Sequence, residues 1–316
     1  GGHDRSWQRA SLAWLVGLQM SHGRSDGKPA RRFPLPLDKV SSQPGGVARA
    51  RPGVPSSAPQ REVLRPQVHL HQIEQDRRRQ TVPQGVGLDS APVRLRMVER
   101  LRADGISHVG VLEAFASMPR HLFVDTALVN QAYEDTSLPI GLGQTISKPS
   151  VVGTMMQLLC ARPGLGMPHV DPVRPLGACL EVGTGCGYQA ALLSLLARHV
   201  ISIERLRDLH LKARTNLDLI RTHLPTWQDV RLVYGDGMIG HPPQAPYDTI
   251  IAAAGGSALP QAWLDQLAPG GRLLAPTEDS RGQGQVLTVV DRLPDGSLQH
   301  TRAGAVLFVP LKSGIT

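Results

Sequence analysis

The chain has 316 residues, of which 41% are hydrophobic and 19% charged, with a formal net charge of +8 at pH 7 and three cysteines. A chain of this length can bury a substantial core, in one large domain or two smaller ones. The cysteines have no metal-like spacing and form no even-numbered disulfide framework, which favours a reducing, cytoplasmic compartment. The longest early apolar run, Leu12–Val16, is too short to cross a bilayer, so we predict no transmembrane segment.

The excess positive charge is concentrated in the first 90 residues. They hold 14 Lys and Arg against 7 Asp and Glu, a net +7, whereas residues 91–316 hold 20 against 19, a net +1. The part of the chain that carries the motifs described below therefore has no strong basic character, and composition does not favour nucleic acid as its partner.

Residues 1–90 are rich in Pro, Gly, Ser and Arg and show little periodicity. They lack the apolar surface that would offset the entropy lost on ordering, so we predict a disordered extension with a short helix near Trp7–Met20. Two alternatives stay open. The segment could be a basic arm that contacts nucleic acid or acidic partners, or an over-extended reading frame whose natural product begins near Met97.

Two short helices are predicted after residue 91. Apolar residues recur at helical spacing from Met97 to Leu101, and Gly105 is suited to end that helix. Ser107 is placed to cap the second helix. Residues 138–149 are predicted to be a loop, because they are rich in turn formers, and residues 150–159 are predicted to be a further helix.

Strands and helices then alternate from residue 178 onward. In chain order we predict strand 178–182, a helix to residue 197, strand 200–204, helix 206–219, strand 230–234, strand 247–253, helix 259–267 and strand 272–276. Such alternation indicates a parallel sheet with helices on both faces. Residues 286–292 and 305–311 flank a hairpin-like turn at 294–296, which predicts an antiparallel pair at the end. The expected fold class is α/β, a doubly wound, mostly parallel seven-stranded sheet.

The first of these strands leads into the turn Glu181-Val182-Gly183-Thr184-Gly185-Cys186-Gly187-Tyr188-Gln189. Its three glycines allow positive φ and let backbone amides approach a ligand closely. The spacing is not the G-x-G-x-x-G of dinucleotide sites, and no Lys-Ser/Thr pair follows as in a P-loop. The acidic residue at its start, Glu181, suits a cationic or hydroxyl-rich ligand better than a pyrophosphate. By itself the turn could equally be an ordinary glycine-rich turn between strand and helix.

Acidic residues follow three successive strands, at Glu181, at Glu204 and at Asp236 within Gly235-Asp236-Gly237. The carboxyl ends of strands in open α/β sheets meet at one edge, where ligands bind. Glu204 lies 21 residues beyond Gly183, a spacing at which an acid accepts hydrogen bonds from ribose hydroxyls. Asp236 is suited to contacting the nucleobase of a nucleoside. Together with the glycine turn, these acids predict an adenosine site.

These three motifs resemble the cofactor-binding motifs of class I S-adenosylmethionine-dependent methyltransferases, which are Rossmann-like. Further segments narrow the resemblance to the protein-L-isoaspartate O-methyltransferase family: Leu138–Gly141, Gly143–Ser147, Ser117–Arg120, Phe123–Asp125 and Phe308–Leu311. The similarity runs from about Val93 to Leu311, and we expect residues 1–90 to have no counterpart in the family. We therefore divide the chain into an extension, 1–90, and a methyltransferase domain, 91–316, with N-terminal helices and substrate loop (91–160), cofactor-binding core (178–277) and C-terminal strands (285–316).

The resemblance implies a monomeric repair enzyme without a metal, which methylates the α-carboxylate of L-isoaspartyl residues in damaged proteins and peptides. It implies S-adenosylmethionine as cofactor, S-adenosylhomocysteine as product, and cofactor contacts at Glu181, Gly183, Thr184, Gly185, Gly187, Tyr188, Gln189, Glu204, Arg205, Gly235, Asp236 and Gly237. It assigns the catalytic position to Ser147, whose hydroxyl would orient the acceptor carboxylate, and substrate contacts to Thr145, Ile146, Val309, Pro310 and Leu311. The alternative for Ser147 is a loop serine that caps the following helix.

Two departures from the family pattern stand out. Residues Ala252–Gly256 replace a segment in which the family usually has Thr or Ser with nearby prolines, and the connection Arg162–Gly177 is longer than usual. Two other functions stay open. A nucleic-acid methyltransferase would need an Asn/Asp-Pro-Pro-aromatic motif after the fourth strand, where this chain has Ala253-Ala254-Gly255-Gly256. A non-catalytic cofactor-binding module could act through the basic extension.

Overall fold

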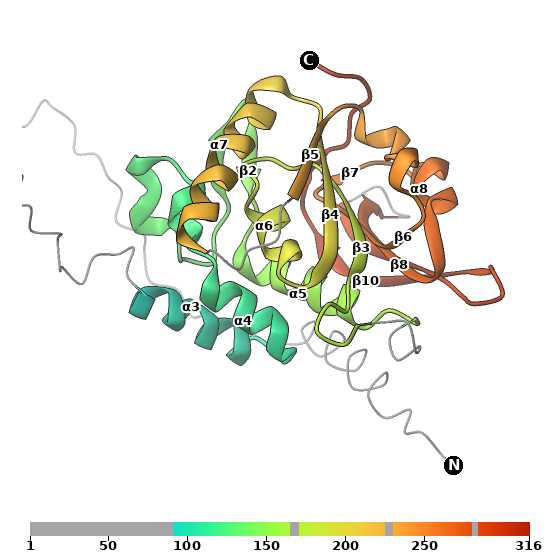
Figure 1. Cartoon of the computed structure of the whole chain (residues 1–316), viewed down its shortest axis with the longest axis horizontal. Helices are drawn as coiled ribbons and strands as arrows, with labels where there is room; N and C mark the ends of the chain where they lie inside the picture. Colours follow the sequence, from blue (N-terminus) through green and yellow to red (C-terminus); the bar gives the residue numbers. More distant parts are fainter. Residues whose placement is uncertain (1–90, 165–170, 225–229, 280–283) are drawn as a thin grey trace, which may run out of the picture. The chain divides into compact units, whose positions relative to one another are not determined.

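The computed structural model describes residues 91–164, 171–224, 230–279 and 284–316, so the predictions for residues 1–90 lie outside it (Figure 1). The described helices and strands are, in chain order, α3 (Ala91–Ala103), α4 (Val109–Ser117), β1 (Leu138–Gly141), β2 (Gln144–Ile146), α5 (Pro149–Cys160), β3 (Gly177–Val182), α6 (Tyr188–Ser194), β4 (Ala197–Glu204), α7 (Arg207–His223), β5 (Val230–Tyr234), β6 (Tyr247–Ala252), β7 (Ala254–Gly255), α8 (Gln261–Asp265), β8 (Leu267–Glu278), β9 (Gln285–Arg292), β10 (Leu298–Val306) and β11 (Val309–Pro310). Short 3₁₀ turns include η3 (Arg120–Phe123) and η5 (Gly237–Ile239). Among the described helices, none is both long and apolar enough to cross a membrane.

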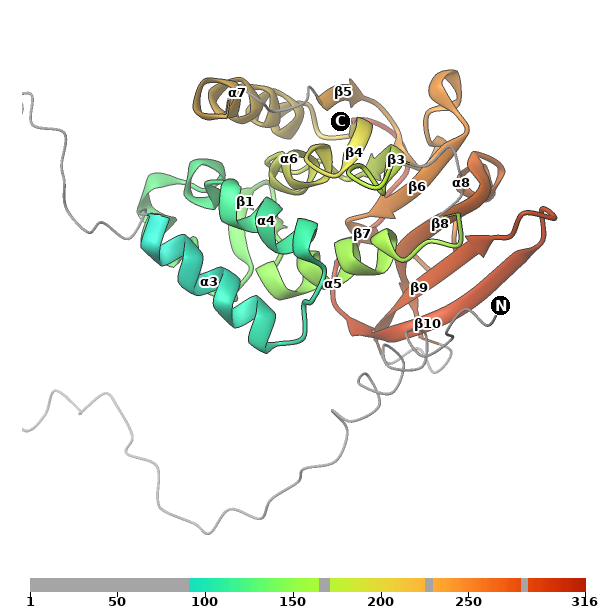
Figure 2. The same ribbon diagram turned by 60° about the horizontal axis from the view of Figure 1, so that its bottom comes forward.

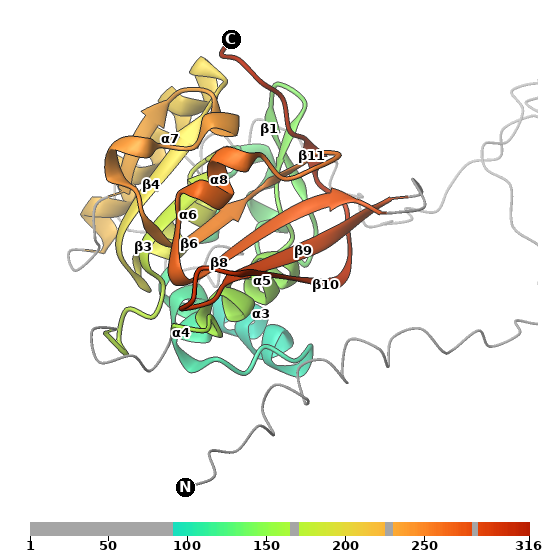
Figure 3. The same ribbon diagram turned by 90° about the vertical axis from the view of Figure 1, so that its right-hand side faces the viewer.

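The central sheet has seven strands in the order β10-β9-β8-β6-β3-β4-β5. Strands β3, β4, β5, β6 and β8 are parallel, whereas β9 is antiparallel to β8 and β10 to β9. Figure 3 shows the three strands of this antiparallel end side by side. The predicted α/β class and the mostly parallel seven-stranded sheet are confirmed. Because the chain passes outward from β3 to β5 and then returns to β6, the strand order reverses beside β3, where open sheets form a ligand crevice.

Helices cover both faces of the sheet, because successive side chains of each strand point to opposite sides. Cys179 and Ile251 belong to a core shared with α3 to α7, while Leu180 and Ile250 belong to a second core with Trp263 of α8. Figure 1 shows α8 on the opposite side of the sheet from α6 and α7, and Figure 2 shows α3 and α4 running side by side. The face that carries α3 to α7 is thus the more thickly covered of the two.

The predicted cap of α4 is wrong. The inward face of α3 is buried as predicted, and the chain turns at Gly105, which has φ +100°. The N-cap of α4 is His108, whose Nδ1 accepts from the amide of Val111 at 3.3 Å. The amide of Ser107 instead donates to Oε1 of Gln157 in α5 at 2.7 Å, because Ser107 lies one residue too early to cap the helix.

Residues 138–146 form a β-hairpin, so the prediction of a loop for 138–149 is wrong over this part. Buried Leu138 and Ile140 alternate with exposed Pro139 and Gly141 along β1, which pairs with β2. The hairpin turns through Leu142, a non-glycine residue at φ +52°. The alternation of apolar residues in β1 is short and includes proline and glycine, so the sequence pattern does not predict this strand, which pairs with β2 alone.

The last strand of the sheet is β10, and the prediction of 305–311 is wrong. Strand β10 begins directly after the turn, with Leu298 opposite Arg292, and ends at Val306. It is an edge strand with exposed polar residues, so apolar alternation does not reveal it. Val309–Pro310 leaves the sheet and pairs in parallel with Ala254–Gly255. Smaller shifts affect α6, α7 and α8, whose ends differ from the predicted ones by one to four residues.

A half-buried ion pair joins β8 to β9 and to α5. Nε and Nη2 of Arg272 donate to the two carboxylate oxygens of Asp291 at 2.7 and 2.8 Å, and Nη1 donates to the carbonyl of Leu158 at 2.7 Å. The two side chains are only 14% and 12% exposed. Removing one partner would leave the other charge poorly solvated.

We therefore expect Asp291→Ala to lower the free energy of unfolding by about 3 kcal/mol, measured by urea denaturation. The double variant Arg272→Met/Asp291→Leu should recover most of this loss, since it removes both charges. The exposed Glu99→Ala is the control and should leave stability unchanged. If Asp291→Ala and the double variant were equally stable, the loss would not come from leaving Arg272 without its partner.

Candidate functional site

The glycine turn after β3 has the backbone that the sequence predicts. Gly183, Gly185 and Gly187 have φ of +93°, +57° and +89°, in the region that residues with a Cβ rarely adopt. A Cβ at Gly185 would lie 3.1 Å from Cδ1 of Ile140, so the turn and the β1–β2 hairpin approach each other closely. Gly187 then begins α6 as its N-cap.

Glu204, at the end of β4, joins the turn to the next helix. Its Oε2 accepts from the amide of Gly185 at 2.8 Å, and its Oε1 accepts from the amide of Leu206 at 3.0 Å. The residue is 5% exposed. Each carboxylate oxygen keeps a further lone pair, so Glu204 can also accept hydrogen bonds from a ligand.

Glu181 lies beneath the turn and is fully buried. The hydroxyl of Ser202 on β4 donates to its Oε2, and Ser202 Oγ lies 2.6 Å from Oγ1 of Thr184 in the turn. Burial raises the pKa of Glu181 to about 8, against the opposing effects of its interactions with the Ser202 hydroxyl and the Gln189 amide. Apart from this interaction with each other, Oε1 of Glu181 and Nε2 of Gln189 are buried without a hydrogen-bond partner among the described residues. A polar ligand group or water beside the turn would complete their hydrogen bonding.

Asp236, at the end of β5, is engaged by the C-terminal segment. Its Oδ1 accepts from the amide of Met238 at 2.9 Å, and its Oδ2 accepts from the amide of Gly314 at 2.6 Å. Nε of Arg205 donates to the carbonyl of Gly314 at 3.0 Å, and the backbones of Arg205 and Thr316 are also hydrogen-bonded. The segment after β11 therefore crosses the ends of β4 and β5 and binds Arg205 and Asp236, two residues predicted to contact the cofactor.

A cavity of about 440 Å³ lies at this edge of the sheet, within the size range of small-molecule sites. The predicted residues that line it are Thr145, Ile146, Ser147, Gly183, Thr184, Gly185, Tyr188, Gln189, Glu204, Arg205, Gly237, Val309, Pro310 and Leu311. Four predicted residues do not line it: Glu181, Gly187, Gly235 and Asp236. The fold thus brings three distant segments, the turn, the hairpin and β11, around one space.

Sequence reasoning missed the apolar part of the lining, which comes from the hairpin, the end of β4 and the start of α7. These residues are Ile140, Leu142, Ile203, Leu206 and Leu209, together with the small Ala253 and Ala254 after β6. Their only signal is hydrophobicity, which core residues share. Cys186 also lines the cavity, and burial raises the pKa of its thiol, so it is a poor nucleophile.

Helix α7 contacts two walls of the cavity, the hairpin and the glycine turn. Nζ of Lys212 donates to the carbonyl of Ile140 at 3.0 Å and to Oδ1 of Asp125 at 2.9 Å. One helical turn further, Nδ2 of Asn216 donates to the carbonyl of Cys186 at 2.9 Å. One face of α7 therefore holds both the hairpin and the glycine turn.

Ser147 follows the hairpin, is half-buried and lines the cavity. Its hydroxyl has no hydrogen-bond partner among the described residues. It does not cap α5, since the N-cap is Lys148, so the alternative interpretation of Ser147 as a helix cap is wrong. The first turn of α5 is bound instead by Asp135, which accepts from the amide and hydroxyl of Ser150 at 2.8 and 2.7 Å.

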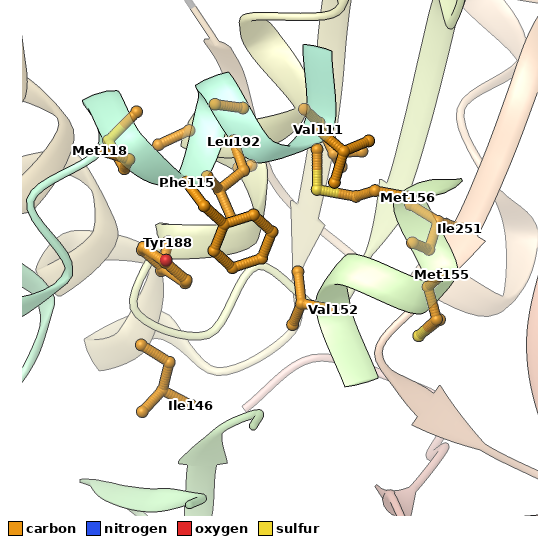
Figure 4. Close-up of a cluster of buried hydrophobic side chains, with 14 of the residues drawn as sticks. Val111, Phe115, Met118, Ile146, Val152, Met155, Met156, Tyr188, Leu192 and Ile251 are labelled. Carbon is orange, nitrogen blue, oxygen red and sulfur yellow. The ribbon is translucent and has the colours of Figure 1, made fainter. Parts of the chain in front are cut away.

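An aromatic cluster supports the turn from the other side. Tyr188 makes edge-to-face contacts with Phe115 and Phe123, with ring centroids 6.3 and 5.3 Å apart. Figure 4 shows Phe115 of α4 above Tyr188, with Ile146 of the hairpin and Val152 of α5 nearby. Helices α4, α5 and α6 and the hairpin thus share one apolar core directly behind the cavity.

Comparison with known proteins identifies the family. Residues 94–316 match the model of the protein-L-isoaspartate(D-aspartate) O-methyltransferase family. A protein-L-isoaspartate O-methyltransferase of Methylibium petroleiphilum is 55% identical over 290 residues, covering 91% of this chain and 97% of the relative. The enzyme of that name from Leptothrix cholodnii is 53% identical over 292 residues, covering 92% and 97%.

These alignments correct one expectation. Residues 91–316 are 226 of the 316 residues, or about 72% of the chain, whereas both alignments cover more than nine-tenths of it. They therefore extend into residues 1–90, which have a counterpart in these relatives although the family model begins at residue 94.

Solved structures agree on the fold. One named protein-L-isoaspartate O-methyltransferase has a TM-score of 0.58 at 25% identity, covering 70% of this chain and 66% of its own. Another, from Plasmodium falciparum and in complex with S-adenosyl-L-homocysteine, has a TM-score of 0.56 at 24% identity, covering 69% and 98%. With the family model matched from residue 94 to the end and relatives more than half identical, the chain belongs to the protein-L-isoaspartate(D-aspartate) O-methyltransferase family.

Proposed function

We propose that this chain transfers a methyl group from S-adenosylmethionine to the α-carboxylate of L-isoaspartyl residues in damaged proteins and peptides, within the described cavity. One observation carries the proposal: a glycine turn with a strand-end acid and a hairpin with an unengaged serine hydroxyl line the same space. Family membership supports the reaction, and the 94–316 match supports a methyltransferase domain that spans 91–316.

The residues of the turn fit this cofactor. When bound, S-adenosylmethionine supplies an electrophilic methyl group on a sulfonium centre. Glu204 would accept hydrogen bonds from the ribose hydroxyls, and the buried Glu181 and Gln189 side chains, whose hydrogen bonding is incomplete, would contact the polar methionine end. Gly237 and Asp236 would contact the adenine. Asp236 would then either accept from the adenine in addition to the Gly314 amide or give up its hydrogen bond with that amide. The neighbour from Plasmodium falciparum, which has the same fold and holds S-adenosyl-L-homocysteine, supports this assignment.

The acceptor needs no strong base on the protein. An α-carboxylate has an ordinary pKa of about 3.5, so it is ionised at neutral pH and is itself the nucleophile. Ser147 would donate a hydrogen bond that orients it, while Thr145, Ile146 and Val309–Leu311 hold the flanking peptide. Orientation alone can lower a barrier by roughly 7–11 kcal/mol. Methanol leaves the ester more readily than hydroxide leaves the ionised acid. The following backbone nitrogen can therefore displace methanol to close a succinimide, and water then reopens the ring partly as aspartate.

We also propose that the chain acts as a monomer in a reducing cytoplasm and does not use nucleic acid as a substrate. The three cysteines are free and buried, which supports a reducing compartment. The near-neutral charge of residues 91–316 supports a non-nucleic-acid substrate.

The proposed reaction is tested with a matched pair of peptides that differ only in an isoaspartyl or an aspartyl linkage. We expect incorporation of the methyl group from labelled S-adenosylmethionine into the isoaspartyl peptide alone. Equal labelling of both peptides, or binding of S-adenosylhomocysteine without labelling of either, would contradict the proposal. An RNA substrate in a third reaction distinguishes the nucleic-acid alternative.

Ser147→Ala should lower kcat/KM for the isoaspartyl peptide by about tenfold or more, because a hydrogen bond to a charged group is lost. The affinity for S-adenosylhomocysteine should stay unchanged in calorimetry. The control is Ser137→Ala, an exposed serine at the start of the hairpin that does not line the cavity. Unchanged kcat/KM in the Ser147 variant would remove its catalytic role.

Glu204→Gln should raise the Kd for S-adenosylhomocysteine by about tenfold or more, since the amide replaces a carboxylate that accepts from two backbone amides and from the ribose. Isothermal titration calorimetry measures this directly. Glu278→Gln, an exposed acid at the end of β8, is the matched control. If both variants bind like the unmodified chain, Glu204 does not hold the cofactor.

A further inference from the structure

Arg120 is a buried cation that forms no ion pair within the described part of the chain. It begins η3 and is 0% exposed, yet no carboxylate of the described residues lies within ion-pair distance of it. The comparable Arg162, 3% exposed, pairs with Asp248 at 3.5 Å. A guanidinium stays protonated even when burial lowers its pKa, as it does for Arg120. Burying such a charge without an ion pair is strongly unfavourable.

The hydrogen bonds of Arg120 lead to the candidate site. Nη2 donates to the carbonyl of Ser147 at 2.8 Å, and Nε donates to the carbonyl of Ala132 at 2.7 Å. Cζ lies 4.7 Å from the ring centroid of Tyr188, the first residue of α6. The guanidinium therefore contacts the serine on the hairpin side and the tyrosine on the turn side at once.

The guanidinium also interacts with the hydroxyl of Tyr188, which opposes the lowering of the pKa of Arg120 by burial. Neither its Nη1 nor that hydroxyl has a further hydrogen-bond partner among the described residues. The two cations that line the cavity are differently placed: Arg205 donates to the carbonyl of Gly314, and Lys312 is exposed. The Asp135 carboxylate is near enough to favour the charged form of Arg120 and raise its pKa, but the two form no ion pair. The positive charge behind Ser147 is therefore only partly compensated, in low-dielectric surroundings where its field is little screened.

We propose that Arg120 is a positioning residue for methyl transfer, which fixes the Ser147 backbone and favours an anionic acceptor at the Ser147 hydroxyl. This inference rests on the proposed function, because the acceptor is the isoaspartyl carboxylate. Arg120 does not line the cavity in which the reactants would bind. It acts through Ser147 and through its charge, so it should affect the acceptor more than the cofactor.

The test uses the full chain and compares three variants. Arg120→Lys keeps the charge but loses the planar fork of donors, Arg120→Met loses both, and Arg162→Lys is a matched buried arginine that also donates to backbone carbonyls but lies outside the cavity. Steady-state kinetics with the isoaspartyl peptide give kcat and KM separately. Calorimetry gives the Kd for S-adenosylhomocysteine, and thermal unfolding gives the Tm.

We expect kcat/KM to fall about tenfold in Arg120→Lys and about a hundredfold in Arg120→Met, with a rise in peptide KM that is larger for Met. The Kd for S-adenosylhomocysteine should stay within about threefold, and Arg162→Lys should lose Tm but keep kcat/KM. If Arg120→Met does not fold, the kcat/KM of Arg120→Lys still tests the inference.

Unchanged kcat/KM in Arg120→Lys would overturn the inference. So would a loss of cofactor affinity equal to the loss of kcat/KM, or a loss of kcat/KM in Arg162→Lys as large as that in Arg120→Lys. An unmodified chain that does not methylate the isoaspartyl peptide would instead overturn the proposed function, so the two failures are distinguishable.

Discussion

The parallel alignment of β3 with β4 and β6 is the constraint on which the rest of the structure depends. Leu180 of β3 lies beside Ile201 of β4 and Ile250 of β6, so the three strands end together at one edge of the sheet. The glycine turn, Glu204 and the small residues after β6 are adjacent for this reason alone. The reversal of strand order beside β3 leaves the crevice that they share.

The second requirement is that the hairpin stays aligned with this edge, although 30 residues or more separate them in sequence. Hydrogen bonds from side chains to backbone carbonyls maintain this alignment. Lys212 donates to the carbonyl of Ile140, Asn216 to that of Cys186, and Arg120 to that of Ser147. Each contact fixes backbone near the cavity and leaves the cavity itself to other side chains. Alignment of acceptor and methyl donor therefore depends on residues that need not touch either one.

The sequence predicted the central sheet well because long apolar strands, glycine spacing and strand-end acids are local signals. It failed where structure depends on partners far along the chain. The β1–β2 hairpin was mistaken for a loop, and β10 was hidden by the polar residues of an edge strand. No local pattern could reveal that Gly314 binds Asp236 or that Arg120 lies behind Ser147, since both contacts join segments brought together only by the fold.

The central claim is that cofactor and acceptor meet between the glycine turn and the hairpin. A crystal structure of the chain with S-adenosylhomocysteine and an isoaspartyl peptide tests it most directly. The account predicts the ribose at Glu204 and the peptide α-carboxylate within hydrogen-bond distance of Ser147 Oγ, flanked by Val309–Leu311. A peptide bound elsewhere, with Ser147 facing only solvent, would contradict it.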